Sequence, residues 1–123
     1  MTLPGRIAEM PTMNSNFQVI HVPATSKLPK CRCLQWIDHY YNHVTSKVRR
    51  STCSVLTCQR EATDGAHVQL VDQRASHDHW IVPLCRSHNK QYNAVMWIDA
   101  RTYLVSAEID RTGCMPNRRL PAM

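Results

Sequence analysis

The stretch that decides the fold runs from residue 53 to residue 93 and reads CSVLTCQREATDGAHVQLVDQRASHDHWIVPLCRSHNKQYN. It contains two pairs of metal-binding residue types at short spacing, one of the form C-x4-C and one of the form C-x2-H. A structural zinc ion takes four such ligands, and one tight turn or one helical turn can present two of them. The alternative is four unrelated residues, with buried or loop cysteines and a surface histidine. We predict a structural zinc ion held by Cys53, Cys58, Cys85 and His88.

Between the two ligand pairs the sequence predicts two strands. Residues 65–71 (GAHVQLV) alternate, so that Ala66 and Val68 share one face and His67 lies on the other. Residues 79–84 (HWIVPL) form a second apolar strand, which a proline places at an edge or ends. Because His67 faces away from the apolar side chains, we expect its replacement to open no large core cavity.

The segments on either side complete one predicted domain. Leu34, Ile37 and Tyr41 recur at helical spacing, which predicts a helix. Prolines exclude a long helix before it, and FQVIHV at 17–22 is typical of an edge strand. We predict an α+β fold with an irregular lead segment at 1–30, a helix at 31–50, a zinc-bound strand-strand-helix unit at 53–94, and a C-terminal hairpin with a loose tail at 95–123.

Composition narrows the classes of protein. The chain has 123 residues, a size typical of one domain, and 43% of them are hydrophobic. Lysine and arginine number 15 against 9 acidic residues, and the net charge of +6 favours a polyanionic partner such as nucleic acid. Neither a signal peptide nor a membrane span is recognisable in the sequence, so we expect a cytoplasmic protein that does not enter membranes. In that compartment the six cysteines would be reduced thiols or metal ligands.

A second group of metal-ligand residue types surrounds the predicted helix. His39 and His43 are four residues apart and so share a helical face, with Cys31 and Cys33 before them and Cys114 far downstream. These residues could build a second metal site. The alternative is that the histidines line a solvated helix face and the cysteines pack.

The run CSVLTC, GAHV and HWIVPLCRSHN resembles the HNH group of His-Me finger (ββα-metal) endonucleases. That family has a cysteine pair, a strand carrying a histidine, a second strand ending in P-L-C, and a helix with the next zinc pair. The resemblance covers residues 53–93. It implies that His67 is the general base that deprotonates water, that Asn89 is a ligand of a catalytic Mg²⁺, and that the four predicted zinc ligands stabilise the fold.

The chain also departs from the family pattern, which leaves three functions open. Ala66 stands where the family often has an acidic metal ligand, although Asp72 or Asp78 could supply a carboxylate. The first hypothesis is an endonuclease, and the second is a catalytically inactive zinc-stabilised module that binds nucleic acid or a nucleic-acid-processing protein. The third is a small regulatory or inhibitor protein that acts through protein contacts. In the first two, the predicted phosphate contacts are Lys47, Arg49, Arg50, Arg60, Arg86 and Lys90.

Overall fold

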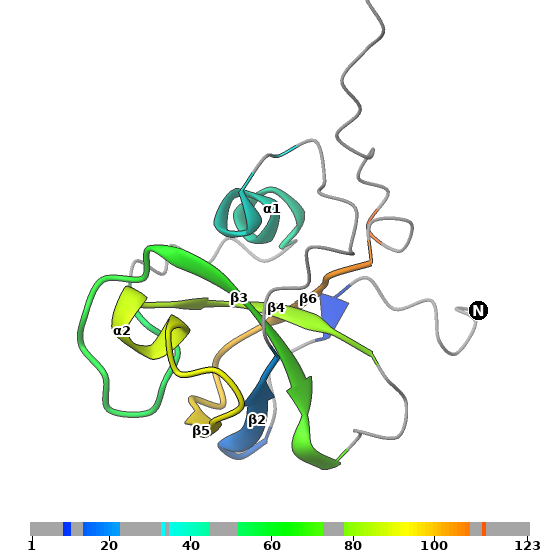
Figure 1. Ribbon diagram of the computed structural model, residues 1–123. Coiled ribbons are helices and arrows are strands. Elements are labelled where there is room, and N and C mark those ends of the chain that lie inside the picture. The colour runs from blue at the N-terminus through cyan, green and yellow to red at the C-terminus, as the bar shows by residue number, and fades with distance from the viewer. Residues whose placement is uncertain are drawn as a thin grey trace, which may run out of the picture.

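The computed structural model describes residues 9–10, 14–22, 33, 35–44, 52–72, 78–108 and 112. It combines helices with one antiparallel sheet, so the predicted α+β class is confirmed (Figure 1). None of its helices is long and apolar enough to cross a membrane. The elements are β1 (Glu9–Met10), β2 (Phe17–His21), α1 (Trp36–His43), β3 (Asp64–Leu70), β4 (Trp80–Leu84), α2 (Arg86–Asn89), β5 (Val95–Ile98) and β6 (Leu104–Ser106).

The sheet has the strand order β1-β6-β4-β3-β2-β5. Its centre is the β3–β4 pair, in which His67 lies opposite Ile81. β2 lies between β3 and β5, because Val19 pairs with a residue of each. The prediction of an edge strand at 17–22 is therefore wrong, and the lead segment is part of the sheet. Alternation alone cannot distinguish an edge strand from an inner one, because strand neighbours come from distant sequence.

The two C-terminal strands are present, but they do not form the predicted hairpin. β5 pairs with β2, whereas β6 pairs with β4 and β1. The turn between them begins where the Thr102 N–H donates to the Asp99 carbonyl oxygen over 3.0 Å. Five residues connect β5 at one edge of the sheet to β6 in its other half.

The two faces of the sheet bury separate apolar clusters. One face packs side chains of β2, β3, β4, β5 and β6 together with Cys53 and Cys85. The other face lies under α1, where Tyr40 packs with Ile81 and Val105 (Figure 1). The Tyr40 hydroxyl also donates to the Tyr103 carbonyl oxygen over 2.9 Å. The helix is thus held to the sheet by both apolar and polar contacts.

The helix is shorter than the sequence predicted. It ends at His43, because Val44 already has an extended backbone, and residues 45–50 lie outside the described residues. Val44 and Thr45 are β-branched, and such residues favour extended conformations. The apolar periodicity of 34–48 therefore continues beyond the end of the helix itself.

A glycine allows the start of α1 to lie directly on β3. A Cβ atom at Gly65 would overlap the carbonyl group of Trp36 and the backbone nitrogen of Ile37. No side-chain rotation can relieve an overlap with backbone atoms. The absent side chain at Gly65 therefore sets the distance between α1 and the sheet.

We expect Gly65→Ala to lower the free energy of unfolding by about 1–3 kcal/mol, the usual cost of overpacking a close contact. Urea denaturation followed by circular dichroism measures the change. Thr63→Ala, at an exposed position two residues earlier, is the control and should stay within about 0.5 kcal/mol of wild type. Equal stability of the Gly65 variant and wild type would contradict the close approach.

Candidate functional site

The first ligand pair lies on a tight loop that its own backbone closes. The Cys53 N–H donates to the Arg60 carbonyl oxygen over 2.8 Å, and the Cys58 N–H donates to that of Val55 over 3.0 Å. Thr57 has a φ of 67°, which lies in the left-handed region. A β-branched residue there costs roughly 1–3 kcal/mol of local strain. This turn brings Cys58 back toward Cys53.

The loop is also attached to the sheet. The Ser54 N–H donates to the Pro83 carbonyl oxygen over 2.9 Å, and the Leu56 N–H donates to that of Trp97 over the same distance. Pro83 is in β4, beyond the residues that pair with β6, so its carbonyl is available to the loop. The loop is therefore fixed beside the end of β4, where the second ligand pair begins.

The second ligand pair occupies the first turn of α2. Cys85 is the N-cap residue, and the Asn89 N–H donates to its carbonyl oxygen over 3.0 Å. The backbone of Ser87 and His88 in this turn acts to lower the pKa of the Cys85 thiol. Because His88 lies about one turn further on, its ring returns to the same side as the cysteine.

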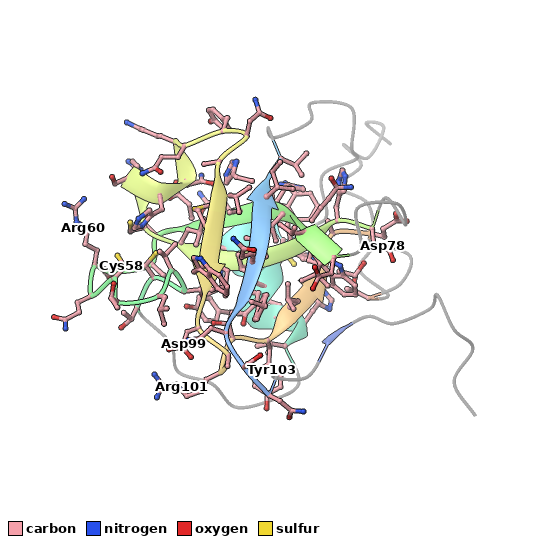
Figure 2. All side chains as sticks on the ribbon, turned by 90° about the horizontal axis from the view of Figure 1, so that it is seen from below. Cys58, Arg60, Asp78, Asp99, Arg101 and Tyr103 are labelled. Atoms are coloured by element: carbon pink, nitrogen blue, oxygen red, sulfur yellow. The ribbon has the colours of Figure 1, made fainter. Side chains whose placement is uncertain are left out.

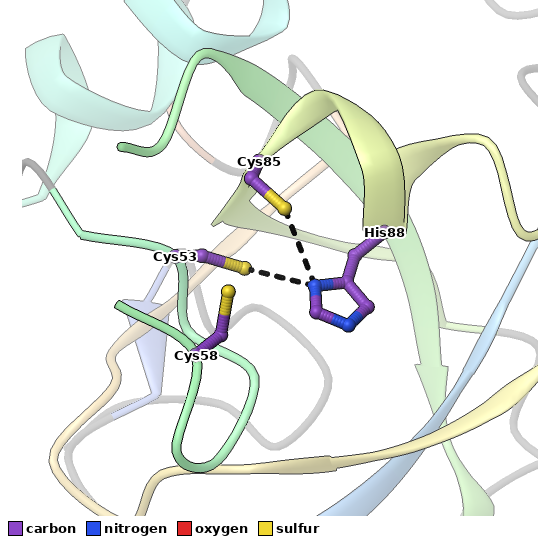
Figure 3. Close-up of side chains that lie close together, drawn as sticks. All are labelled: Cys53, Cys58, Cys85 and His88. Carbon is purple, nitrogen blue, oxygen red and sulfur yellow. Dashed lines mark hydrogen bonds between the residues drawn. The ribbon is translucent and has the colours of Figure 1, made fainter. Parts of the chain in front are cut away.

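Figure 3 shows the four predicted ligands converging, two from the loop and two from α2. Their ligand atoms all lie within 4.8 Å of one another. The His88 Nδ1 atom is 3.3 Å from the Cys85 sulfur and 3.6 Å from the Cys53 sulfur. Zinc bond lengths of about 2.3 Å to sulfur and about 2.0 Å to nitrogen give tetrahedral edges of about 3.6 Å. The cluster is positioned to hold a metal ion, and its donor atoms suit zinc.

The protonation of these thiols is coupled to the presence of a cation. Burial raises the pKa of Cys53 to about 12. Burial also acts to raise the pKa of Cys85, but the hydrogen bonds to its sulfur outweigh this and lower the pKa. A buried group of thiolates is stable only with compensating positive charge, which a divalent ion supplies. Cys53, Cys58 and Cys85 form no disulfide, as ligand cysteines should not.

Replacing one ligand should release this metal. We expect Cys85→Ser to lose one metal equivalent per chain and to unfold at a clearly lower temperature, because metal binding and folding are linked. Elemental analysis and thermal denaturation measure the two effects. Ser87→Ala changes an exposed non-ligand in the same turn and should keep the metal. A Cys85 variant with full metal content would rule out this ligand set.

A pocket of about 360 Å³ opens beside the metal cluster. It contains His67 and Asn89, which the sequence predicted to act together although 22 residues separate them. The segments that form it are the end of β2, the start of α1, the start of β3 and the short helix α2. Its lining is His21, Val22, Gln35, Trp36, Ile37, Thr63, Asp64, Gly65, His67, Arg86, Asn89 and Tyr92.

Asn89 is held from both sides by polar partners. Its Oδ1 atom is 2.8 Å from the His21 Nε2 atom, and its Nδ2 atom donates to the Asp64 carboxylate over 2.9 Å. With Oδ1 as an acceptor, the proton of the His21 ring must lie on Nε2. Arg86 reaches the other Asp64 oxygen at 3.6 Å. The amide of Asn89 therefore has a defined orientation at the pocket wall.

His67 lies on the face that the sequence predicted, but α1 covers that face. The residue is 4% exposed, and its ring meets the Trp36 ring edge-on with centroids 4.5 Å apart. Its Nε2 atom is buried and has no hydrogen-bond partner among the described residues. Burial lowers the pKa of His67 to about 4, so the ring is neutral at neutral pH. Its loss would open a cavity under Trp36, contrary to the sequence-based expectation.

The sequence analysis missed His21 and Asp64. Asp64 lies three residues before His67 and supplies the only carboxylate among the described residues that line the pocket. The candidates named instead, Asp72 and Asp78, do not line it, and Ala66 faces the apolar core. The sequence pattern at 53–94 could not predict His21, because β2 is distant in sequence and reaches the pocket only through its pairing with β3.

Three of the predicted phosphate contacts are described, and all are exposed. Arg60 points outward from the metal-binding loop (Figure 2), while Arg86 and Lys90 lie at α2. Of these, Arg86 lines the pocket. Lys47, Arg49 and Arg50 lie outside the described residues.

Comparisons of this chain with protein-family models, with curated proteins and with solved structures found no match. The site must therefore be interpreted from its own geometry and chemistry.

Acid should destabilise the protein through His67. The unfolded ring takes up a proton near pH 6.5, whereas the folded ring does so only near pH 4. Between these pH values the unfolded state binds more protons than the folded state. The contribution of the neutral His67 to the free energy of unfolding is therefore complete above pH 6.5 and is lost toward pH 4, by up to about 3 kcal/mol.

We expect His67→Gln to remove this part of the pH dependence, because glutamine does not titrate. Urea unfolding of wild type and variant at several pH values between 4 and 7 measures the difference. Loss of metal in acid lowers the stability of both proteins. The difference between their unfolding free energies, followed against pH, therefore reports His67 alone. Equal slopes of unfolding free energy against pH would mean that the folded His67 ring takes up its proton at the same pH as the unfolded one.

Proposed function

We propose that the metal of the four-ligand cluster is zinc and that β3, β4 and α2 form an HNH-like ββα unit with endonuclease activity. The observation that carries this proposal is the shared pocket of His67 and Asn89. Two residues named by the resemblance as base and metal ligand line one opening in the surface. The strand-strand-helix order and the position of the zinc ligands beside the pocket agree with that proposal.

In the proposed reaction His67 removes a proton from the water that attacks a phosphodiester. A neutral imidazole can accept that proton, and His67 is neutral at neutral pH because it is buried. Arg86, largely exposed at the pocket edge, binds the negative phosphate oxygens. Its ion pair with Asp64 holds the guanidinium close to the pocket without satisfying all its donors.

A divalent cation such as Mg²⁺ would take oxygen donors from Asp64 and Asn89 once the Asn89 amide gives up its present contact with one of its two partners. These two residues are hydrogen-bonded to each other in the pocket, and Mg²⁺ accepts few protein oxygens with water completing its shell. The cation would supply stabilisation of charge on the phosphate and the leaving oxygen. His21 acts as a positioning residue, since its contact with Oδ1 orients the Asn89 amide.

A second candidate is the catalytically inactive module that binds nucleic acid or a processing protein. The observation that favours it is the position of Trp36, whose ring packs against His67 and leaves it 4% exposed. In addition, both polar atoms of the Asn89 amide already have protein partners. For this candidate the exposed Arg60, Arg86 and Lys90 supply the phosphate contacts.

The nuclease proposal predicts a large loss of activity in one variant. We expect His67→Gln to lower the cleavage rate by about 10²–10⁴-fold, the usual contribution of a general base. Glutamine is used because alanine would open a cavity under Trp36. Purified zinc-loaded protein is incubated with Mg²⁺ or Mn²⁺ and with single- and double-stranded DNA and RNA, and products are separated by electrophoresis.

The controls separate chemistry from folding. Gln69→Ala changes the next residue on the same face of β3, outside the pocket lining, and should cleave as wild type does. Asn89→Ala should also lose activity, with partial recovery at raised Mg²⁺ or Mn²⁺ if water replaces the amide oxygen. If wild type cleaves no substrate but binds nucleic acid with an affinity that falls steeply with salt, the inactive binding module is correct.

A further inference from the structure

A second group of metal-ligand side chains lies on and just before α1, where the His39 ring contacts the Trp36 ring with centroids 5.0 Å apart. The ligand atoms of Cys33, His39 and His43 all lie within 4.8 Å of one another. The two histidine rings, one helical turn apart, have centroids 4.7 Å apart. His39 is 0% exposed, so the alternative of a solvated histidine face is wrong for this residue.

The surroundings of this group are those of a metal site. The Nε2 atom of His39 lies 2.9 Å from the carbonyl oxygen of Ser106, an acceptor, so the ring proton must be on Nε2. A metal would then be bound through Nδ1, and such a contact of Nε2 to a carbonyl is the usual outer partner of a ligating histidine. Asn42 donates a hydrogen bond to the Cys33 sulfur over 3.3 Å, which stabilises a thiolate.

The chemistry of the three donor atoms also suits a soft or borderline divalent cation. Two neutral imidazoles next to a thiol offer a metal one soft and two borderline donors. Such a donor set suits zinc, and a water molecule or a further ligand can complete the tetrahedron.

We propose that Cys33, His39 and His43 bind a second zinc ion, independent of the four-ligand cluster. This ion joins the chain before α1 to the helix and, through the Ser106 carbonyl, the helix to β6. It thereby fixes α1 on the sheet and Trp36 against His67. Cys31 and Cys114, also considered from the sequence, lie outside the described residues.

Metal counting tests this proposal directly. Full-length protein is saturated with zinc, freed of loose metal on a chelating resin and measured by elemental analysis. Wild type should hold two zinc ions per chain, and Cys33→Ser and His43→Gln should each hold one. Cys85→Ser should lose the other ion. Cobalt substitution should show two sets of tetrahedral absorption bands in wild type and one in each variant.

Two further variants make the result specific. Asn42→Ala should keep two ions but bind the second about 10–100-fold more weakly, the usual effect of removing a residue that hydrogen-bonds to a metal ligand. Competition with a chromophoric chelator measures this affinity. His79→Gln makes the same change as His43→Gln at a half-buried histidine outside the group and should keep both ions. One zinc ion in wild type, or two in Cys33→Ser, would overturn the second site.

Discussion

The structure depends on the convergence of four side chains from two segments that the β3–β4 hairpin separates. Cys53 and Cys58 come from a loop, and Cys85 and His88 come from the first turn of α2. The donor atoms lie within 4.8 Å of one another, and thiolates so close together are stable only with the charge of a cation. A metal bound there would link the turn at Thr57 to α2 at the end of β4.

The pocket follows from this arrangement because Asn89 is the residue after His88. Once the cluster orients α2, Asn89 reaches His21 on β2 and Asp64 on β3. Three elements therefore meet at one amide group. The glycine at position 65 lets α1 approach the same place, so that Trp36 forms one wall and the neutral His67 lies beneath it.

This arrangement buries His67, the general base of the proposed nuclease, almost completely. Burial keeps the His67 ring neutral, and the same lowered pKa of about 4 makes it a weaker base than an exposed histidine. The same burial limits access of water and substrate, and Trp36 is the side chain that controls it. The position of α1 thus decides how far His67 is exposed, and the Cys33, His39 and His43 group lies on the segment and helix that carry Trp36.

Local sequence patterns were enough to predict the α+β class, the extents of β3 and β4 to within a residue, and the four residues of the cysteine-histidine cluster. These follow from local signals: period-two alternation and ligand pairs that one turn can present. Only the tertiary structure decided that β5 and β6 lie apart, that β2 is an inner strand, and that His21 and Asp64 reach Asn89. It also decided that α1 buries His67. Alternation along the strand predicts which face of the sheet His67 is on, but not whether a helix packs over that face. Each of these depends on pairing or packing between segments distant in sequence, for which no short pattern exists.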